Sequence, residues 1–226
     1  MKIVDPSSLS ATLDAVNDAF FHGRALSKSE RERAAQWIAR RQGRPGSYAD
    51  MFAPTDRDFA EGTTLFTGET IRTRAGMAHI LGEEACRALI LLNVSTSTVR
   101  QALDRASLGM MSRLRKAREL VTGTYCCGKC TCALWRHLAV GGLENAERRL
   151  AAGMKTLKFR RDGRGKWKVF PFHYTLLALS EIDLPSAIKE MRYAAPVCEQ
   201  LLNRRARDDK YDRRRRVLAE RILAKC

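Results

Sequence analysis

The sequence predicts an all-α protein, an array of about five antiparallel helical hairpins forming a solenoid arc or an α/α-toroid-like ring. Apolar residues recur with the 3.6-residue period of a helix through most of the chain, and strand-like alternation is nearly absent. Helix-start signals precede several of these segments. A faint repeat of about 40 residues is typical of stacked helical hairpins. Residues 1–226 are therefore expected to form a single helical domain.

The N-terminal part predicts two helices followed by a long connection. The first helix has one apolar face, formed by Leu9, Leu13, Val16 and Phe20. Ser27 and Glu30 have the spacing of a capping box, which predicts the start of the second helix. Residues 43–70 are rich in Gly, Pro, Thr and aromatic residues and are too long for an ordinary connector. We expect a packed functional loop or a lid there, or else a segment pinned beneath the core by its phenylalanines.

The middle of the chain continues the helical pattern. Helices are predicted over 74–92 and from the cap at 95–97 onward, and another is expected around 132–139. The second of these has an apolar face formed by Val99, Leu103, Ala106, Met110, Leu114 and Val121. A further amphipathic helix has Leu143, Ala146, Leu150, Met154 and Leu157 on one face.

The C-terminal part predicts a pair of helices over roughly 174–182 and 184–203 and a basic helix from about 209 to 225. Asp183 is the expected N-cap of the second, with Pro185 in its first turn. Pro196 is expected to bend that helix. Residues 130–150 resemble residues 174–191, with Thr131 matched to Thr175 and Ala146 to Ala187. Both segments have the pattern of a short apolar helix, a tight turn and an amphipathic helix.

The positive charge is concentrated in one part of the chain. The formal net charge is +16, but residues 1–94 contain 12 Lys/Arg and 12 Asp/Glu and are balanced. The whole excess therefore lies in residues 95–226. Such asymmetry favours an anionic partner: nucleic acid, acidic lipid or another polyanion, or a phosphorylated small molecule.

Composition also limits the compartment. The longest apolar run found, residues 88–92, is far shorter than the roughly 20 residues of a membrane helix. The N-terminus lacks the apolar core of a secretory signal. Seven cysteines, an odd number, fit a reducing environment better than a disulfide framework. A cytoplasmic protein with no transmembrane segment is expected.

The strongest local signal is the segment Tyr-Cys-Cys-Gly-Lys-Cys-Thr-Cys at 125–132. Cys127 and Cys130 have the Cys-x-x-Cys spacing that lets two thiolates bind one soft cation. Because there is no second such pair, further ligands must come from Cys126, Cys132, His137 or His173. A reduced, packed or redox-sensitive cluster is the alternative. Zinc is the expected metal, with an iron–sulfur cluster as the other possibility.

The repeat gives His173 a specific place in this hypothesis. If the two hairpins stack in parallel, His173 begins the helix adjacent to the one that Cys130 begins. Two cysteines and one histidine would then meet, leaving an open fourth position, as in catalytic zinc sites. A fourth cysteine would instead make the site structural.

Residues 165–179 contain Gly-Lys-Trp and then Phe-Pro-Phe-His-Tyr-Thr-Leu-Leu-Ala-Leu, and they resemble an inner-helix segment of the prenyltransferase and terpene-cyclase α/α-toroid proteins. In zinc-dependent members of that group, the ligands include a cysteine and a histidine at the starts of different inner helices. The resemblance implies that Cys130 or Cys127, together with His173, would hold the metal. It covers residues 126–191 only, and the aspartate ligand expected near the cysteine and the Asp-rich motif of the cyclases are missing.

Two basic stretches are candidate anion-binding surfaces. The first spans 155–170 and is interleaved with aromatic residues, as phosphate backbones and unstacked bases require; its candidates are Lys155, Lys158, Arg160, Arg161, Arg164, Lys166, Trp167 and Lys168. The second spans 204–216 and contains Arg204, Arg205, Arg207, Arg213, Arg214, Arg215 and Arg216. A solvated charged tail, partly paired with nearby aspartates, is the alternative for the second stretch.

These observations lead to three functional hypotheses. The first is a helical-repeat protein that binds a polyanion, above all nucleic acid, and has a cysteine-rich zinc site. The second is a metal-assisted enzyme acting on a phosphorylated or diphosphate substrate in a helical-toroid cavity. The third is a non-catalytic interaction scaffold. No phosphate-binding glycine loop or catalytic triad is recognisable, so no catalytic residue is assigned.

Overall fold

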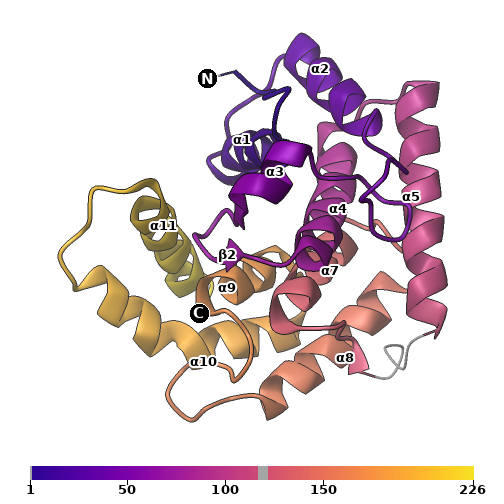
Figure 1. Cartoon of the computed structure of the whole chain (residues 1–226). Helices are drawn as coiled ribbons and strands as arrows, with labels where there is room; N and C mark the ends of the chain where they lie inside the picture. The colour runs from indigo at the N-terminus through magenta and orange to yellow at the C-terminus, as the bar shows by residue number, and fades with distance from the viewer. Residues whose placement is uncertain (1, 117–121) are drawn as a thin grey trace. The chain divides into compact units, whose positions relative to one another are not determined.

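The structure, a computed structural model, describes residues 2–116 and 122–226 and confirms the all-α fold (Figure 1). These residues form ten helices and one two-stranded hairpin. The chain divides into two compact units. Unit 1 comprises residues 1–65, 70–117 and 140–144, and unit 2 comprises residues 66–69, 118–139 and 145–226. The stacking of hairpins into an arc or ring stays a prediction.

Unit 1 is built around α4 (Arg74–Leu92), which contacts every other helix of the unit. Those helices are α1 (Leu9–Phe21), α2 (Lys28–Ala39), α3 (Asp56–Glu61) and α5 (Ser97–Lys116). The predicted capping box of α2 is confirmed, because the Ser27 and Glu30 side chains each accept a hydrogen bond from the other residue's backbone N–H. Val121, the last expected residue of the α5 face, lies outside the described residues.

The long segment at 43–70 is packed and partly regular. It contains α3 and one strand of a short antiparallel hairpin, β1 (Thr63–Thr64) with β2 (Thr70–Ile71). Phe52 is fully buried. The buried Asp58 carboxylate accepts hydrogen bonds from Ser8 Oγ at 2.6 Å and from the Leu9 backbone N–H at 2.9 Å, which ties α3 to the start of α1. These contacts support a segment pinned beneath the core rather than a lid.

A polar network is buried within the apolar core of unit 1. Arg87 Nη1 donates to Asn17 Oδ1 at 2.7 Å, and Asn17 Nδ2 donates to Glu84 Oε2 at 3.3 Å. One helical turn away, His79 Nε2 lies 3.5 Å from Glu83 Oε1. All five residues are at most 7% exposed. Buried charges are tolerated only when paired, so this network fixes how α1 and α4 face each other.

Unit 2 contains the five remaining helices: α7 (Gly128–Ala139), α8 (Ala146–Phe159), α9 (Phe172–Glu181), α10 (Pro185–Leu202) and α11 (Lys210–Ala224). α7 packs on α8 and α9, and α10 packs on α8, α9 and α11. Arg136 on α7 forms two hydrogen bonds, at 2.9 and 3.0 Å, with the Glu181 carboxylate of α9. α7 and α9 are therefore adjacent, as the repeat required.

Two helix boundaries in unit 2 differ from the sequence prediction. α7 begins at Gly128, several residues earlier than expected, because the Cys-x-x-Cys segment is already its first turn. The N-cap of α10 is Leu184 rather than Asp183, with Pro185 as the first helical residue. Pro196 lies inside α10, and the bend expected there stays a prediction.

Candidate metal centre

Three cysteines meet at the start of α7. The sulfur atoms of Cys126, Cys127 and Cys130 all lie within 4.8 Å of one another. Cys126 and Cys127 are exposed and Cys130 is buried, so the group opens to solvent on one side. Zinc–thiolate bonds are about 2.3 Å long, so three sulfurs around a tetrahedral ion lie about 3.8 Å apart. Small side-chain rotations would close the group around an ion, and the three cysteines could hold one.

The loop before α7 is held by a single threonine. Thr131 Oγ1 donates to the Tyr125 carbonyl at 2.8 Å and accepts from the Tyr125 backbone N–H at 2.9 Å. The Thr131 backbone N–H donates to the Cys127 carbonyl at 2.9 Å. Cys126 lies between these contacts with a left-handed backbone, φ 51°. In the sequence, Thr131 stands out only as the match of Thr175 in the repeat, and no local pattern predicts this supporting role.

Two glycines let neighbouring backbone approach this loop. A Cβ on Gly128 would lie 2.2 Å from the Val169 carbonyl oxygen, so only glycine fits where α7 begins. A Cβ on Gly123 would lie 2.2 Å from the Gly153 nitrogen on α8. Trp135 Nε1 donates to the Gly123 carbonyl at 2.7 Å. The loop is thus fixed at both ends before any ion binds.

The electrostatics of the group favour a cation. The pKa of the Cys130 thiol is raised well above its ordinary value, first by its hydrogen bond with Cys127, then by burial and by the charges of Cys127 and Cys126. Three thiolates at this spacing repel one another, so they cannot all ionise in the absence of a positive charge. A bound soft cation removes that repulsion and leaves three deprotonated ligands.

Three of the candidate ligands, Cys132, His137 and His173, are not brought into this group. The Sγ of Cys132 is buried and lies 3.4 Å from Thr175 Oγ1 on α9. Burial, above all, raises the Cys132 pKa to about 12. Thr175 therefore faces α7, and a residue two positions earlier is rotated about 200° around the helix. His173 accordingly lies elsewhere, near Arg215, Lys166 and Asp212, which influence its charge. The predicted Cys, Cys, His set becomes a set of three cysteines.

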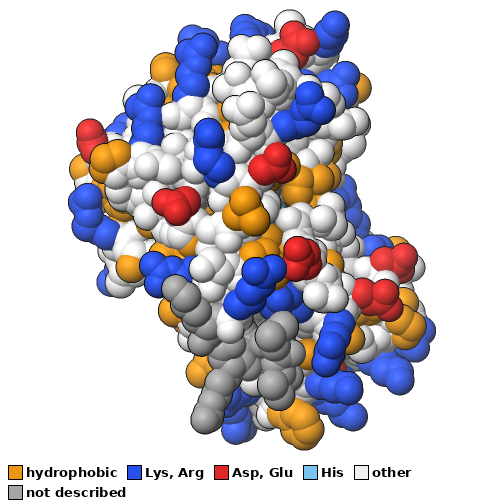
Figure 2. Space-filling view, turned by 90° about the vertical axis from the view of Figure 1, so that its right-hand side faces the viewer, with side chains coloured by type: hydrophobic (Ala, Val, Ile, Leu, Met, Phe, Trp, Pro, Cys, Tyr) orange, Lys and Arg blue, Asp and Glu red, His pale blue; other side chains and the backbone are white. Residues whose placement is uncertain are grey.

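The first basic stretch forms the end of α8 and a hairpin over residues 160–168. Across the hairpin, the Asp162 backbone N–H donates to the Lys166 carbonyl at 2.9 Å and the Lys168 N–H donates to the Arg160 carbonyl at 2.7 Å. Arg161 pairs with Trp167 as an isolated bridge. Its exposed cations are Lys155, Lys158, Arg160, Arg164, Lys166 and Lys168. Figure 2 shows Lys and Arg side chains spread over the whole of the face that it draws.

Two residues of this stretch have structural roles instead. Arg161 donates to both carboxylate oxygens of Glu190 on α10, at 3.0 and 2.9 Å. Trp167 is 4% exposed, and its Nε1 donates to the same Glu190 at 2.9 Å. Its ring stacks on Phe172. The prediction that Trp167 stacks on an unpaired base does not fit this burial, because the ring fills the space between the hairpin and α10.

The four consecutive arginines of the second stretch each have a separate partner. Arg213 pairs with Asp208 at 2.7 Å, and Arg216 pairs with Asp212 at 2.9 Å. Arg214 is buried, donates to the Phe66 carbonyl and lies over the Phe66 ring, and Arg215 Nε donates to the Thr67 carbonyl. Arg214 and Arg215 hold α11 against residues 66–69. Of the second stretch, Arg204, Arg205 and Arg207 are left as exposed cations outside the helix.

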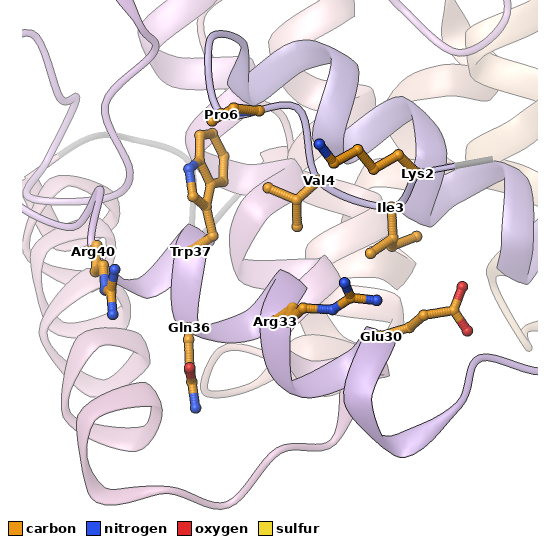
Figure 3. A pocket seen from close by; sticks show the side chains of 9 residues that line it. All are labelled: Lys2, Ile3, Val4, Pro6, Glu30, Arg33, Gln36, Trp37 and Arg40. Atoms are coloured by element: carbon orange, nitrogen blue, oxygen red, sulfur yellow. The ribbon is translucent and has the colours of Figure 1, made fainter.

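Unit 1 contains a separate pocket of about 350 Å³ between the N-terminal segment and α2 (Figure 3). Ile3, Val4, Pro6 and Trp37 give it an apolar side. Three cations, Lys2, Arg33 and Arg40, also line it. None of the predicted site residues lies in this pocket.

Comparison with known proteins gives no match: no protein-family model, curated protein sequence or solved structure resembles the chain. The resemblance to the α/α-toroid proteins therefore stays a prediction. None of the described helices is both long and apolar enough to span a membrane. Assignment of function rests on the geometry of unit 2.

Proposed function

We propose that unit 2 is a metal-binding module in which Cys126, Cys127 and Cys130 hold one zinc ion. The observation behind the proposal is the meeting of three sulfur atoms within 4.8 Å of one another on a loop that is already fixed. Three thiolates leave one coordination position of a tetrahedral ion open to solvent, where water or a ligand would bind. Cys132 is directed to Thr175, which argues against both a closed four-cysteine site and a four-cysteine iron–sulfur cluster.

Elemental analysis and an absorbance spectrum of the purified protein test this proposal. One zinc per chain is expected, with no visible absorbance. Cys127→Ser and Cys130→Ser should each release the ion, and affinity should fall on acidification because protons compete for the thiolates. Cys226→Ser is the matched control, because Cys226 is also exposed but lies outside the group. Full occupancy in a Cys127→Ser/Cys130→Ser double variant would rule out the site.

We further propose that unit 2 binds a polyanion, with nucleic acid as the first candidate. Counted over its sequence, this unit has 24 Lys/Arg and 12 Asp/Glu, a net +12 of the total +16. The exposed cations lie on α8 and on the 160–168 hairpin. Hydrogen bonds from the hairpin to Glu190 and Tyr193 of α10 hold the hairpin in place. Phosphate groups bind such preorganised charges without sequence specificity. The alternative ligand to nucleic acid is a phosphorylated small molecule that binds at the open coordination position of the zinc. Such a molecule would bind to the protein in the absence of nucleic acid.

A further inference from the structure

We propose that Cys127 and Cys130 also form a reversible disulfide by exchange with a low-molecular-weight disulfide of the glutathione type. The inference concerns the same cysteines as the proposed zinc site, but thiol–disulfide exchange itself requires no metal. Its starting point is a difference in exposure. Cys127 precedes the first residue of α7 and is exposed, whereas Cys130, three residues later, is 2% exposed. One sulfur is accessible to an external disulfide and the other is shielded from it.

The geometry of the helical turn suits an internal bond. Residues three apart on a helix have neighbouring side chains, with Cβ atoms about 5–6 Å apart. A disulfide requires Cβ atoms about 3.5–4.5 Å apart, so the turn must tighten by roughly 1–2 Å. The Cys127 and Cys130 sulfurs already lie within 4.8 Å of each other. Because Cys127 is at the helix end and not within it, its backbone has room to make this adjustment.

The surrounding contacts hold the pair in place while it reacts. Gly128 lies against the Val169 backbone, and the Thr131 N–H donates to the Cys127 carbonyl. A pair held in this way loses little conformational freedom on closing. The alternative bond between Cys126 and Cys127 would close a small ring through one peptide group and would strain its planarity. The structure therefore favours Cys127 with Cys130 over the adjacent pair.

The exchange proceeds in two steps. The Cys127 thiolate attacks one sulfur of oxidised glutathione, the glutathione S–S bond breaks, and one glutathione thiolate leaves. Cys130 then gives its proton to solvent and attacks the Cys127 sulfur, which breaks the mixed disulfide and releases the second glutathione thiolate. Two electrons pass from the cysteine pair to glutathione. Cys126 stays a thiol, and a bound zinc would lose two of its three ligands and dissociate.

The experiment equilibrates the reduced full-length protein with defined ratios of reduced and oxidised glutathione, followed by acid quenching and peptide mass mapping. A disulfide joining Cys127 to Cys130 is expected in the wild-type protein. Cys130→Ser should accumulate a glutathione adduct at Cys127, since the resolving sulfur is gone. Cys127→Ser should leave the buried Cys130 largely unmodified. Cys226→Ser should behave like the wild-type protein, and far-UV circular dichroism checks that each variant is folded.

Two results would overturn the inference. One is the absence of any internal disulfide in the wild-type protein at excess oxidised glutathione, a measurement that needs no variant. The other is a disulfide that joins Cys126 to either partner. Metal binding is scored separately with a zinc-chelating dye. Zinc binding without the disulfide would refute this inference alone, and the disulfide without zinc binding would refute the proposed zinc site alone.

Discussion

At the scale of single residues, His173 is a pH-sensitive part of the fold. Burial, and then the positive charges of Arg215 and Lys166, lower its pKa from 6.5 to about 4. The unfolded chain takes up a proton near pH 6.5, but the folded protein does so only near pH 4. Folding therefore loses stability as the pH falls from about 6.5 toward 4.

Replacing this residue should remove that pH dependence. Relative to His173→Gln, the wild-type protein should lose about 2 kcal/mol of unfolding free energy between pH 7.5 and pH 5. Urea unfolding of both proteins across this range, with metal removed, measures the difference. A constant difference between them would show that His173 ionises normally in the folded state.

Gly128 is a second single residue on which the site depends. Helix propensity alone predicts that Gly128→Ala stabilises α7 by about 1 kcal/mol. The added Cβ would meet the Val169 carbonyl oxygen at 2.2 Å, so we expect a net loss of about 1–3 kcal/mol instead. Denaturant unfolding measures the change. Ala substitution at Gly163, where a Cβ meets nothing within 4 Å but φ is +83°, is the comparison for backbone strain alone.

The cysteine group could be predicted from the sequence, but the position of His173 could not. Cys126, Cys127 and Cys130 were found because they are close in sequence, and local spacing determines their contact. His173 was misplaced because the repeat gave the correct neighbouring helices but not the rotation of α9 about its axis. Thr175, not His173, faces Cys132. Rotation depends on packing with residues far away in the chain, which a local pattern does not contain.

At the scale of elements, α11 shows how a charged run can be structural. Arg214→Ala should lower the unfolding free energy by about 2 kcal/mol, because it leaves the Phe66 carbonyl without this buried donor and removes the guanidinium from the Phe66 ring. Arg213→Ala is the matched control on the same helix. Its partner Asp208 is fully exposed, so the change should be below about 0.5 kcal/mol. Equal losses in thermal or urea unfolding would contradict this account of α11.

Helix existence was predictable and helix ends were less so. The capping box at Ser27 was read correctly because its signal is local. α7 was expected to begin later because a Cys-x-x-Cys segment is typical of a turn between ligands, yet its first turn is helical. The composition of 43–70 predicts a packed functional loop, a lid or a pinned segment, but it does not predict α3, although Thr55 and Asp58 form a capping box at its start. Asp58 also accepts a hydrogen bond from Ser8, which is far away in the chain. Such a contact has no local signature.

At the scale of the whole molecule, the charge distribution predicts salt-sensitive binding. If five cations contact phosphates of duplex DNA, the slope of log affinity against log salt is about −4.5. Replacing Lys155, Lys158, Arg160, Arg164 and Lys168 with Gln should flatten this slope and weaken binding. Fluorescence anisotropy with labelled DNA and RNA at several salt concentrations measures both effects.

A control variant that loses the same net charge elsewhere separates the loss of the proposed contact residues from the loss of net charge alone. Arg33, Arg40, Arg44, Arg72 and Arg100 are exposed residues of unit 1, and their replacement with Gln removes the same net charge. This control variant should retain most of the affinity for nucleic acid and most of the slope of log affinity against log salt. Failure of the wild-type protein to bind either nucleic acid at physiological ionic strength would remove the nucleic-acid proposal.

The central claim is that three cysteines of unit 2 bind one metal ion, and X-ray absorption at the zinc edge tests it most directly. The spectrum reports the type, number and distance of the atoms bound to zinc. We predict three sulfur atoms at about 2.3 Å and one lighter oxygen or nitrogen atom. A ligand shell without sulfur, or a protein that does not retain stoichiometric zinc, would contradict the account.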